Sequence, residues 1–194
     1  MVKIYYIPIF GKVFGGKSVV VRQIIDSFVQ RQDLQVAGYT QPSAFEDGDR
    51  IGYDLTLIKN DRTLETYKFA RLGKHAKPGK IPYIFEPSVF DEVYNTACSI
   101  HSNGKPAIVF LDEVGRLETM QKQGHHKSIL KYIEVFQNAK SMHLIITYNE
   151  RRKDETAKYM DEIGAEQSTL SYDKSNESIT VQDFCNQILE EALK

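Results

Sequence analysis

The stretch Gly11-Lys12-Val13-Phe14-Gly15-Gly16-Lys17-Ser18 decides how the rest of this chain is interpreted. It fits the pattern G-x-x-x-x-G-K-[ST], in which a glycine-rich loop wraps around the phosphates of a nucleotide. Such a loop must point successive N–H groups inward, and side chains at its tightest points would collide with phosphate oxygens. The pattern therefore predicts a phosphate-binding loop formed by Gly11, Lys12, Val13, Phe14, Gly15, Gly16, Lys17 and Ser18.

The segments on either side of this loop have the character that it requires. Val2 to Phe10 is rich in β-branched and aromatic residues, which predicts a buried strand. Lys17 to Gln30 carries apolar residues at helical spacing, which predicts an amphipathic helix. The positive end of that helix would face the bound anion, with Lys17 at the β and γ phosphates and the Ser18 hydroxyl left for Mg²⁺. We therefore expect ATP or GTP as ligand, with Mg²⁺.

A second informative element, this one acidic, lies in the middle of the chain, where the apolar run Ile108 to Leu111 is followed by Asp112 and Glu113. On a central strand the acids would emerge at the carboxyl end, where open α/β sheets bind ligands. Asp112 would hold Mg²⁺ through water, and Glu113 would act as a general base or orient the attacking water. A strand ending in two acids is also typical of an ordinary solvated strand end.

Between the loop helix and the acidic strand, the pattern changes to alternation over residues 34–72. Gln35 to Thr40, Arg50 to Ile58 and Leu64 to Ala70 are predicted strands of an inserted antiparallel meander. Residues 73–82 combine prolines, glycines and lysines without periodicity, which favours an exposed, mobile loop.

The remaining chain alternates between helices and strands. Strands are predicted at Pro106 to Leu111 and His143 to Thr147, and a further pair at Gln167 to Tyr172 and Ser178 to Val181 is expected to form a hairpin. Helices are predicted at Pro87 to Ser102, Lys127 to Gln137, Glu150 to Ile163 and Gln182 to Leu193. We therefore predict one α/β domain over residues 1–194, a three-layer α/β/α sandwich of the P-loop type with a mostly parallel sheet.

The composition restricts the possible partners. The chain has 194 residues, of which 41% are hydrophobic and 26% charged, with a net charge of −1. This balance disfavours nucleic acid, and no apolar run approaches membrane-spanning length or resembles a signal peptide. We expect a cytoplasmic protein without a membrane partner, although an unidentified protein partner remains open. His125-His126 is expected to be a solvated loop pair, with a metal site as the alternative.

Several motifs together resemble the cancer-related nucleoside-triphosphatase family. They are the phosphate loop, Val36 to Pro42, Asp49 to Leu55, Phe69 to Gly73, and the block Asp112-Glu113-Val114-Gly115-Arg116-Leu117-Glu118. The resemblance covers roughly residues 3–150. It implies a P-loop fold with an extra strand between the loop strand and the acidic strand, and hydrolysis of nucleoside triphosphates.

The resemblance also assigns residues. It implies phosphate binding by Gly11 to Ser18, with Asp112 and Glu113 serving the metal and the water. Together with the loop motif, this makes Lys17 and Glu113 the expected catalytic residues and Ser18 and Asp112 the expected metal ligands. Arg71 matches the family arginine and would stabilise charge on the transferring phosphoryl group, although a surface arginine at a strand end is the simpler interpretation. Glu118 matches the last acid of the block, or is a helix-start carboxylate. Residues 154–194 lie beyond the matched motifs and are expected to be a chain-specific ending.

The leading hypothesis is therefore a nucleoside triphosphate phosphohydrolase. A P-loop kinase or nucleotide-dependent biosynthetic factor is the alternative, and it would need a second pocket for its acceptor. A non-hydrolysing nucleotide switch is the third possibility. The sequence contains nothing that distinguishes adenine from guanine, because the loop recognises phosphates alone.

Overall fold

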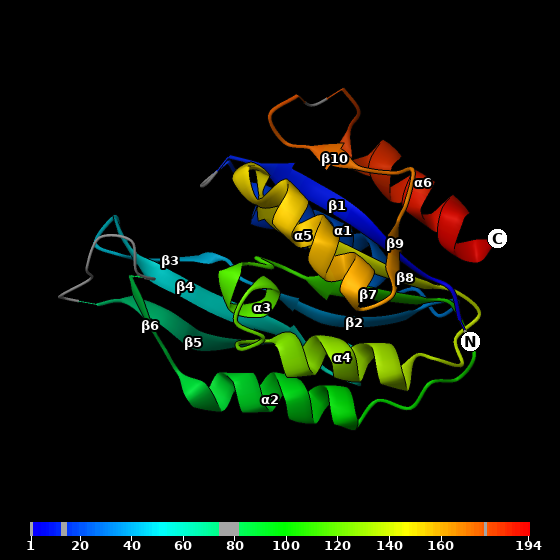
Figure 1. Cartoon of the computed structure of the whole chain (residues 1–194), viewed down its shortest axis with the longest axis horizontal. Helices are drawn as coiled ribbons and strands as arrows, with labels where there is room; N and C mark the ends of the chain where they lie inside the picture. Colours follow the sequence, from blue (N-terminus) through cyan, green and yellow to red (C-terminus); the bar gives the residue numbers. More distant parts are fainter. Residues whose placement is uncertain (1, 13–14, 74–81, 177) are drawn as a thin grey trace.

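A mostly parallel sheet forms the centre of the molecule, in a computed structural model that describes residues 2–12, 15–73, 82–176 and 178–194 (Figure 1). Its strand order is β10-β1-β8-β7-β2-β4-β5-β6. The central parallel strands are β1 (Ile4–Gly11), β8 (Met142–Asn149), β7 (Ala107–Leu111) and β2 (Gln35–Thr40). β8 separates the strand that leads into the phosphate loop from the strand that ends at the two acids, as the family resemblance implied.

The antiparallel part of the sheet continues from β2. β4 (Asp49–Ile58) pairs with β2 and with β5 (Leu64–Leu72), and β5 pairs with the short β6 (Tyr83–Phe85). These strands confirm the predicted meander. The structure adds β3 (Ser43–Glu46), which pairs with β4 across the turn at Asp47 and Gly48. The predicted loop at 73–82 lies outside the described residues except for its ends, where the Gly73 amide donates to the Pro82 carbonyl at 2.8 Å.

Helices cover both faces of the sheet. α1 (Lys17–Phe28) and α6 (Val181–Leu193) pack on one face, against the buried side chains of Ile7, Ile108 and Ile145. α2 (Pro87–Cys98), α4 (His126–Val135) and α5 (Lys153–Glu162) pack on the other face. Two short turns complete the helical structure, α3 (Arg116–Thr119) and the 3₁₀ turn η1 (Glu150–Arg152). The three-layer α/β/α architecture predicted from the sequence is therefore confirmed.

The predicted hairpin near the carboxyl end is wrong. β9 (Ala165–Gln167) and β10 (Tyr172–Asp173) each pair in parallel with β1, on the edge opposite β8. Residue 181 opens α6 instead of ending a strand, because the Thr180 hydroxyl caps that helix by accepting from the Asp183 amide. Parallel pairing with β1 covers an edge that would otherwise leave backbone groups without partners.

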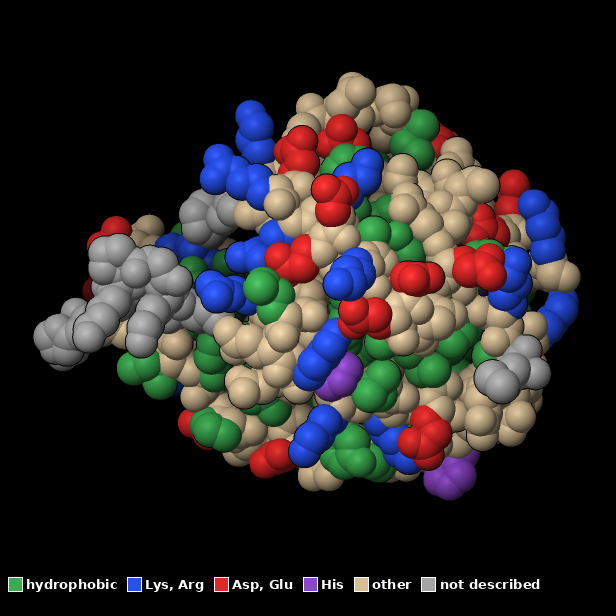
Figure 2. Space-filling view, viewed as in Figure 1, with side chains coloured by type: hydrophobic (Ala, Val, Ile, Leu, Met, Phe, Trp, Pro, Cys, Tyr) green, Lys and Arg blue, Asp and Glu red, His purple; other side chains and the backbone are tan. Residues whose placement is uncertain are grey.

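Of the helices within the described ranges, none combines the length and the apolar character needed to cross a membrane. Basic and acidic side chains are interspersed over much of the face in Figure 2, and several Lys and Arg side chains gather toward the end where β1 and β8 finish. That end is where the phosphate loop and the acidic pair meet.

Candidate functional site

The phosphate loop follows β1 directly and opens into α1. Gly16 adopts a left-handed conformation with φ of 83°, which a residue with a side chain rarely does, and it is the residue before the first turn of α1. The side chain of Lys17 is only 4% exposed, and its ammonium donates to the carbonyl of Lys12 at 3.2 Å. Val13 and Phe14, which the sequence assigned to the loop, lie outside the described residues. The first turn of α1 is closed by the amides of Val19 and Val20, which donate to the Gly16 carbonyl at 3.1 and 3.3 Å.

Asp112 is held rigidly at the end of β7. Its side chain is fully buried, and one carboxylate oxygen accepts from the Thr40 hydroxyl and from the Gln41 amide, both at 2.7 Å. The Gln41 side chain in turn donates to the Asp112 carbonyl at 3.0 Å. Thr40 ends β2 and Gln41 follows it, so the neighbouring parallel strand fixes the carboxylate.

Thr147 on β8 aligns both acids at once. Its hydroxyl donates to the second oxygen of Asp112 at 2.5 Å and accepts from the Glu113 amide at 2.7 Å. Glu113 itself has a φ of 59°, a left-handed conformation that costs energy for a non-glycine residue. The bond from its amide to Thr147 therefore helps to hold the chain in the turn that presents the Glu113 side chain.

The Glu113 carboxylate lies 3.8 Å from the ammonium of Lys17. Burial raises the pKa of Glu113, and the nearby Asp112 raises it further, whereas Lys17 and Arg50 lower it. The side chain is recessed but still 34% exposed, so solvent-sized groups reach it although protein surrounds it on most sides. A carboxylate with a raised pKa at this position is suited to accept a proton near neutral pH.

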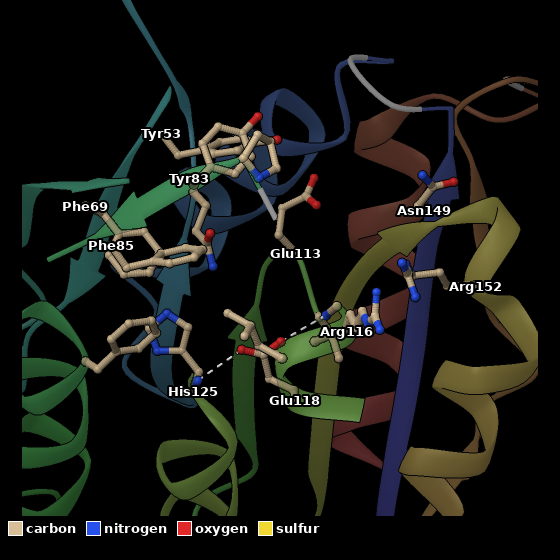
Figure 3. A pocket seen from close by; sticks show the side chains of 16 residues that line it. Tyr53, Phe69, Tyr83, Phe85, Glu113, Arg116, Glu118, His125, Asn149 and Arg152 are labelled. Atoms are coloured by element: carbon tan, nitrogen blue, oxygen red, sulfur yellow. Dashed lines mark hydrogen bonds between the residues drawn. The ribbon is translucent and has the colours of Figure 1, made fainter. Parts of the chain in front are cut away.

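Two cavities meet at Glu113. The first has a volume of about 630 Å³ and is lined by Gly15 to Val19, by Arg22 and Gln23, by residues of β3 and β4, and by Glu113. The second has a volume of about 390 Å³ and lies toward α2 and α4 (Figure 3). The residues that line both are Tyr53 and Glu113.

In the wall of the second cavity, Glu118 and His125 form a buried pair. The Glu118 carboxylate is 5% exposed and accepts from the amides of Gly115 at 3.1 Å and His125 at 3.0 Å (Figure 3). Burial raises the pKa of Glu118 to about 7 and lowers the pKa of His125 to about 3. The expectation of a solvated pair at His125-His126 is wrong for His125, whose ring is buried among Tyr39, Phe69 and Phe90.

Arg71 lies apart from these groups. Its guanidinium donates to the Asp54 carboxylate at 2.6 Å and to the Tyr53 carbonyl at 2.7 Å, and it lines neither cavity at Glu113. Instead, the structure brings Arg50 to the site, where it stacks on Tyr53 with 4.2 Å between the guanidinium carbon and the ring centre. The role of Arg71 stays a prediction.

The donor set near the loop fits Mg²⁺. This ion usually binds through one or two carboxylates, waters and substrate phosphates. The Ser18 hydroxyl donates to the Gln41 carbonyl at 3.5 Å, next to the amide that holds Asp112. A Ser hydroxyl and one Asp carboxylate at this spot match that chemistry, and the described part of the chain contains no cluster of three or more His, Cys, Asp or Glu that would suit another metal.

This fold and this arrangement together define the class of P-loop nucleoside-triphosphate-binding proteins in which one additional strand separates the loop from the acidic pair. A family model described as NTPase matches residues 6–180. The chain belongs to this family and is a nucleoside triphosphatase. No curated protein sequence matches the chain.

Two solved structures have a similar fold. The solution structure of a human cancer-related nucleoside triphosphatase is 14% identical, has a TM-score of 0.58, and covers 96% of this chain and 96% of its own. The crystal structure of THEP1 from the hyperthermophile Aquifex aeolicus is 15% identical, has a TM-score of 0.54, and covers 97% of this chain and 99% of its own. The similarity therefore includes residues beyond 150, where the sequence motifs ended.

Sequence reasoning missed four groups that the fold brings to the acids, namely Thr40, Gln41, Arg50 and Thr147. Thr147 is a polar residue at the end of the apolar run of β8, and the other three lie within the motifs Val36 to Pro42 and Asp49 to Leu55 that carry the family resemblance. Arg50 and Gln41 lie in the meander, where alternation predicts strands but does not show which residue reaches the loop.

Proposed function

We propose that this nucleoside triphosphatase hydrolyses ATP or GTP with Mg²⁺ at the junction of the phosphate loop and the Asp112-Glu113 turn. Gly11 to Ser18 would bind the phosphates, with Lys17 at the β and γ phosphates. Asp112 and the Ser18 hydroxyl would hold Mg²⁺, which when bound supplies positive charge against the phosphate oxygens.

The observation that carries this proposal is the convergence of three separate elements on one point. The Lys17 ammonium from α1 lies 3.8 Å from the Glu113 carboxylate after β7, and Thr147 from β8 fixes the position of both acids. Glu113 would accept a proton from the attacking water or orient it, at the side of the loop where the γ-phosphate would end. Its raised pKa supports a proton-accepting role.

The test is phosphate release from ATP, GTP, CTP and UTP, each with Mg²⁺ and with excess EDTA. We expect Glu113→Gln to lower kcat by about 10²–10⁴-fold with nucleotide binding retained, because general-base groups contribute on that scale. Lys17→Ala is expected to weaken binding and turnover together. Full turnover in Glu113→Gln would exclude Glu113 from the mechanism, and undiminished turnover in EDTA would exclude the metal.

Matched controls come from an ion pair on the surface. Lys3 and Glu166 lie 2.9 Å apart, with side chains 60% and 62% exposed, near the opposite end of β1 from the loop. Lys3→Ala and Glu166→Gln repeat the same chemical changes away from the site. Both controls should keep wild-type kcat and KM, so that a loss confined to Lys17→Ala and Glu113→Gln reports on the site itself.

A further inference from the structure

The second cavity at Glu113 has two chemically different ends. One end is aromatic, with Phe69, Phe85, Phe90, Tyr53 and Tyr83 in its wall. These rings pack against one another, with 5.3 Å between the ring centres of Phe69 and Phe85 and 5.0 Å between those of Phe69 and Phe90. A wall of this kind favours a planar ring as the bound group, since aromatic pairs gain from offset and edge contacts.

The other end of the cavity is polar and lies next to the reacting groups. Asn149, Arg116 and Arg152 line it, opposite the aromatic rings and with Glu113 between (Figure 3). Asn149 ends β8 and pairs in register with Gly11, the first residue of the phosphate loop. A molecule whose ring occupied the aromatic end would therefore present its other end to Glu113 and to the phosphate loop.

The cavity also has the dimensions of a small-molecule site. Its volume of about 390 Å³ lies within the range of about 300–1,000 Å³ that is typical of ligand pockets. Both ring nitrogens of His125 in its wall form no hydrogen bond to another described residue, although the side chain is 1% exposed. Buried polar atoms without partners cost free energy, and a polar ring atom of a ligand would offer one after a small shift of the covering side chains.

We propose that this cavity is an acceptor site, which takes a small molecule with a planar aromatic ring and an alcohol group and receives the γ-phosphoryl group on that alcohol. The inference rests on the proposed function, because the same loop and the same Glu113 would act on either acceptor. Water is then the acceptor only when no alcohol occupies the cavity.

The transfer balances without another reactant. The alcohol oxygen forms a bond to the γ-phosphorus as the bond from that phosphorus to the β–γ bridging oxygen breaks. The electron pair of the broken bond stays on the nucleoside diphosphate, and the alcohol proton passes to the Glu113 carboxylate. The products are a phosphate monoester, a nucleoside diphosphate and one proton.

The first measurement is binding, because it does not depend on turnover. Adenosine and 4-hydroxybenzyl alcohol serve as probes, and ribose serves as the probe that lacks a ring. Saturation-transfer NMR is recorded on the full chain with Mg²⁺ and a non-hydrolysable ATP analogue, so that the loop is occupied. We expect at least one aromatic probe to bind and ribose not to bind. Absence of binding by both aromatic probes overturns the proposal.

Substitutions at two neighbouring residues of β6 test whether the probe binds in the cavity. Phe85 lines the cavity, whereas Ile84 is 69% exposed on the other face of the strand. Phe85→Ala should weaken probe binding at least tenfold and Ile84→Ala should leave it unchanged. Phe90→Ala replaces Phe85→Ala if the latter has lost its thermal transition. Equal binding in the wild type and the cavity variant places the probe elsewhere and overturns the proposal.

The second measurement follows the label from γ-³²P-labelled ATP. Labelled monoester of the bound probe supports the proposal, and the identity of the labelled probe distinguishes a nucleoside from a simple aromatic alcohol. A probe that binds in the cavity while all label appears as inorganic phosphate overturns the transfer step but leaves the triphosphatase proposal intact. If neither monoester nor phosphate forms, the proposed hydrolysis has failed, and the binding data still decide whether the cavity takes aromatic alcohols.

Discussion

Replacing Thr147 by valine tests whether one hydroxyl holds the two acids in place. The hydroxyl is buried and forms two bonds, to the Asp112 carboxylate and from the Glu113 amide. A bond to a charged group is worth about 1.5–3 kcal/mol and a neutral bond about 0.5–1.5 kcal/mol. Valine has nearly the same shape, so we expect the free energy of unfolding to fall by about 2–4.5 kcal/mol, with little contribution from a cavity.

In Thr147→Val we also expect kcat to fall under conditions in which the variant is still folded, so the loss of stability alone does not explain the loss of activity. Glu113 adopts a strained left-handed conformation, and the lost bond lets its side chain leave the position 3.8 Å from Lys17. Unfolding in urea gives the stability of the wild type, Thr147→Val and Thr147→Ser, and phosphate release below the unfolding transition gives kcat. Serine keeps the hydroxyl and loses only a buried methyl group, which costs about 1 kcal/mol. If Thr147→Ser loses as much kcat as Thr147→Val, the hydroxyl does not position Glu113 and the reasoning is refuted.

Three further predictions concern the surrounding residues. His125→Phe should raise the free energy of unfolding at pH 7 by about 1–3 kcal/mol, because an apolar ring replaces two buried nitrogens that have no partner among the described residues. A lower free energy of unfolding in this variant would contradict the prediction. The pKa of His125 falls to about 3 on folding, so the unfolded chain takes up a proton on this ring at a higher pH than the folded chain does. Titration of His125 therefore leaves the free energy of unfolding of the wild type unchanged above about pH 6.5 and lowers it as the pH falls toward 3. The advantage of phenylalanine should therefore grow by about 2 kcal/mol at pH 5, and equal differences at both pH values argue against a neutral buried His125. Gly124→Ala should destabilise the fold by more than about 2 kcal/mol, since φ is 61° and the added methyl group would lie 2.3 Å from the Glu118 carboxylate. Gly164→Ala is the control, because φ is 78° there but the space is open, so only the backbone cost of about 1–2 kcal/mol applies. Equal urea midpoints for the two variants would contradict the predicted contact. Arg50→Ala should move the acidic limb of the pH profile of kcat to higher pH, because Arg50 lowers the pKa of Glu113. Arg50→Lys should keep most of the wild-type profile, because it keeps the positive charge. If the limb does not move in Arg50→Ala, the titration of Glu113 does not cause it.

Local patterns predicted much of this fold because they depend on neighbouring residues. The glycine loop, the apolar run before Asp112 and the alternation of β4 and β5 are all visible in short windows of sequence. β9 and β10 were missed because strands of three and two residues have no measurable period, and only contact with β1 defines them.

The supports of the site were harder to predict for a related reason. Thr40 and Asp112 are 72 positions apart, and Thr147 and Asp112 are 35 apart, so their bonds arise from strand order. The aromatic wall of the second cavity combines residues from β4, β5, β6 and α2, each of which could equally be an ordinary core position in sequence. Motifs therefore identified the candidate site residues, and topology determined which side chains hold them in position.

The contact between Lys17 and Glu113 affects the stability of the folded chain at the candidate site. An ammonium group that is 4% exposed needs negative charge nearby, since a buried ion without a partner is strongly destabilising. The Glu113 carboxylate and the Lys12 carbonyl provide it from within the chain. A bound nucleotide would take over that neutralisation and release Glu113 for the acceptor, so substrate entry is an exchange of counter-charges for one lysine.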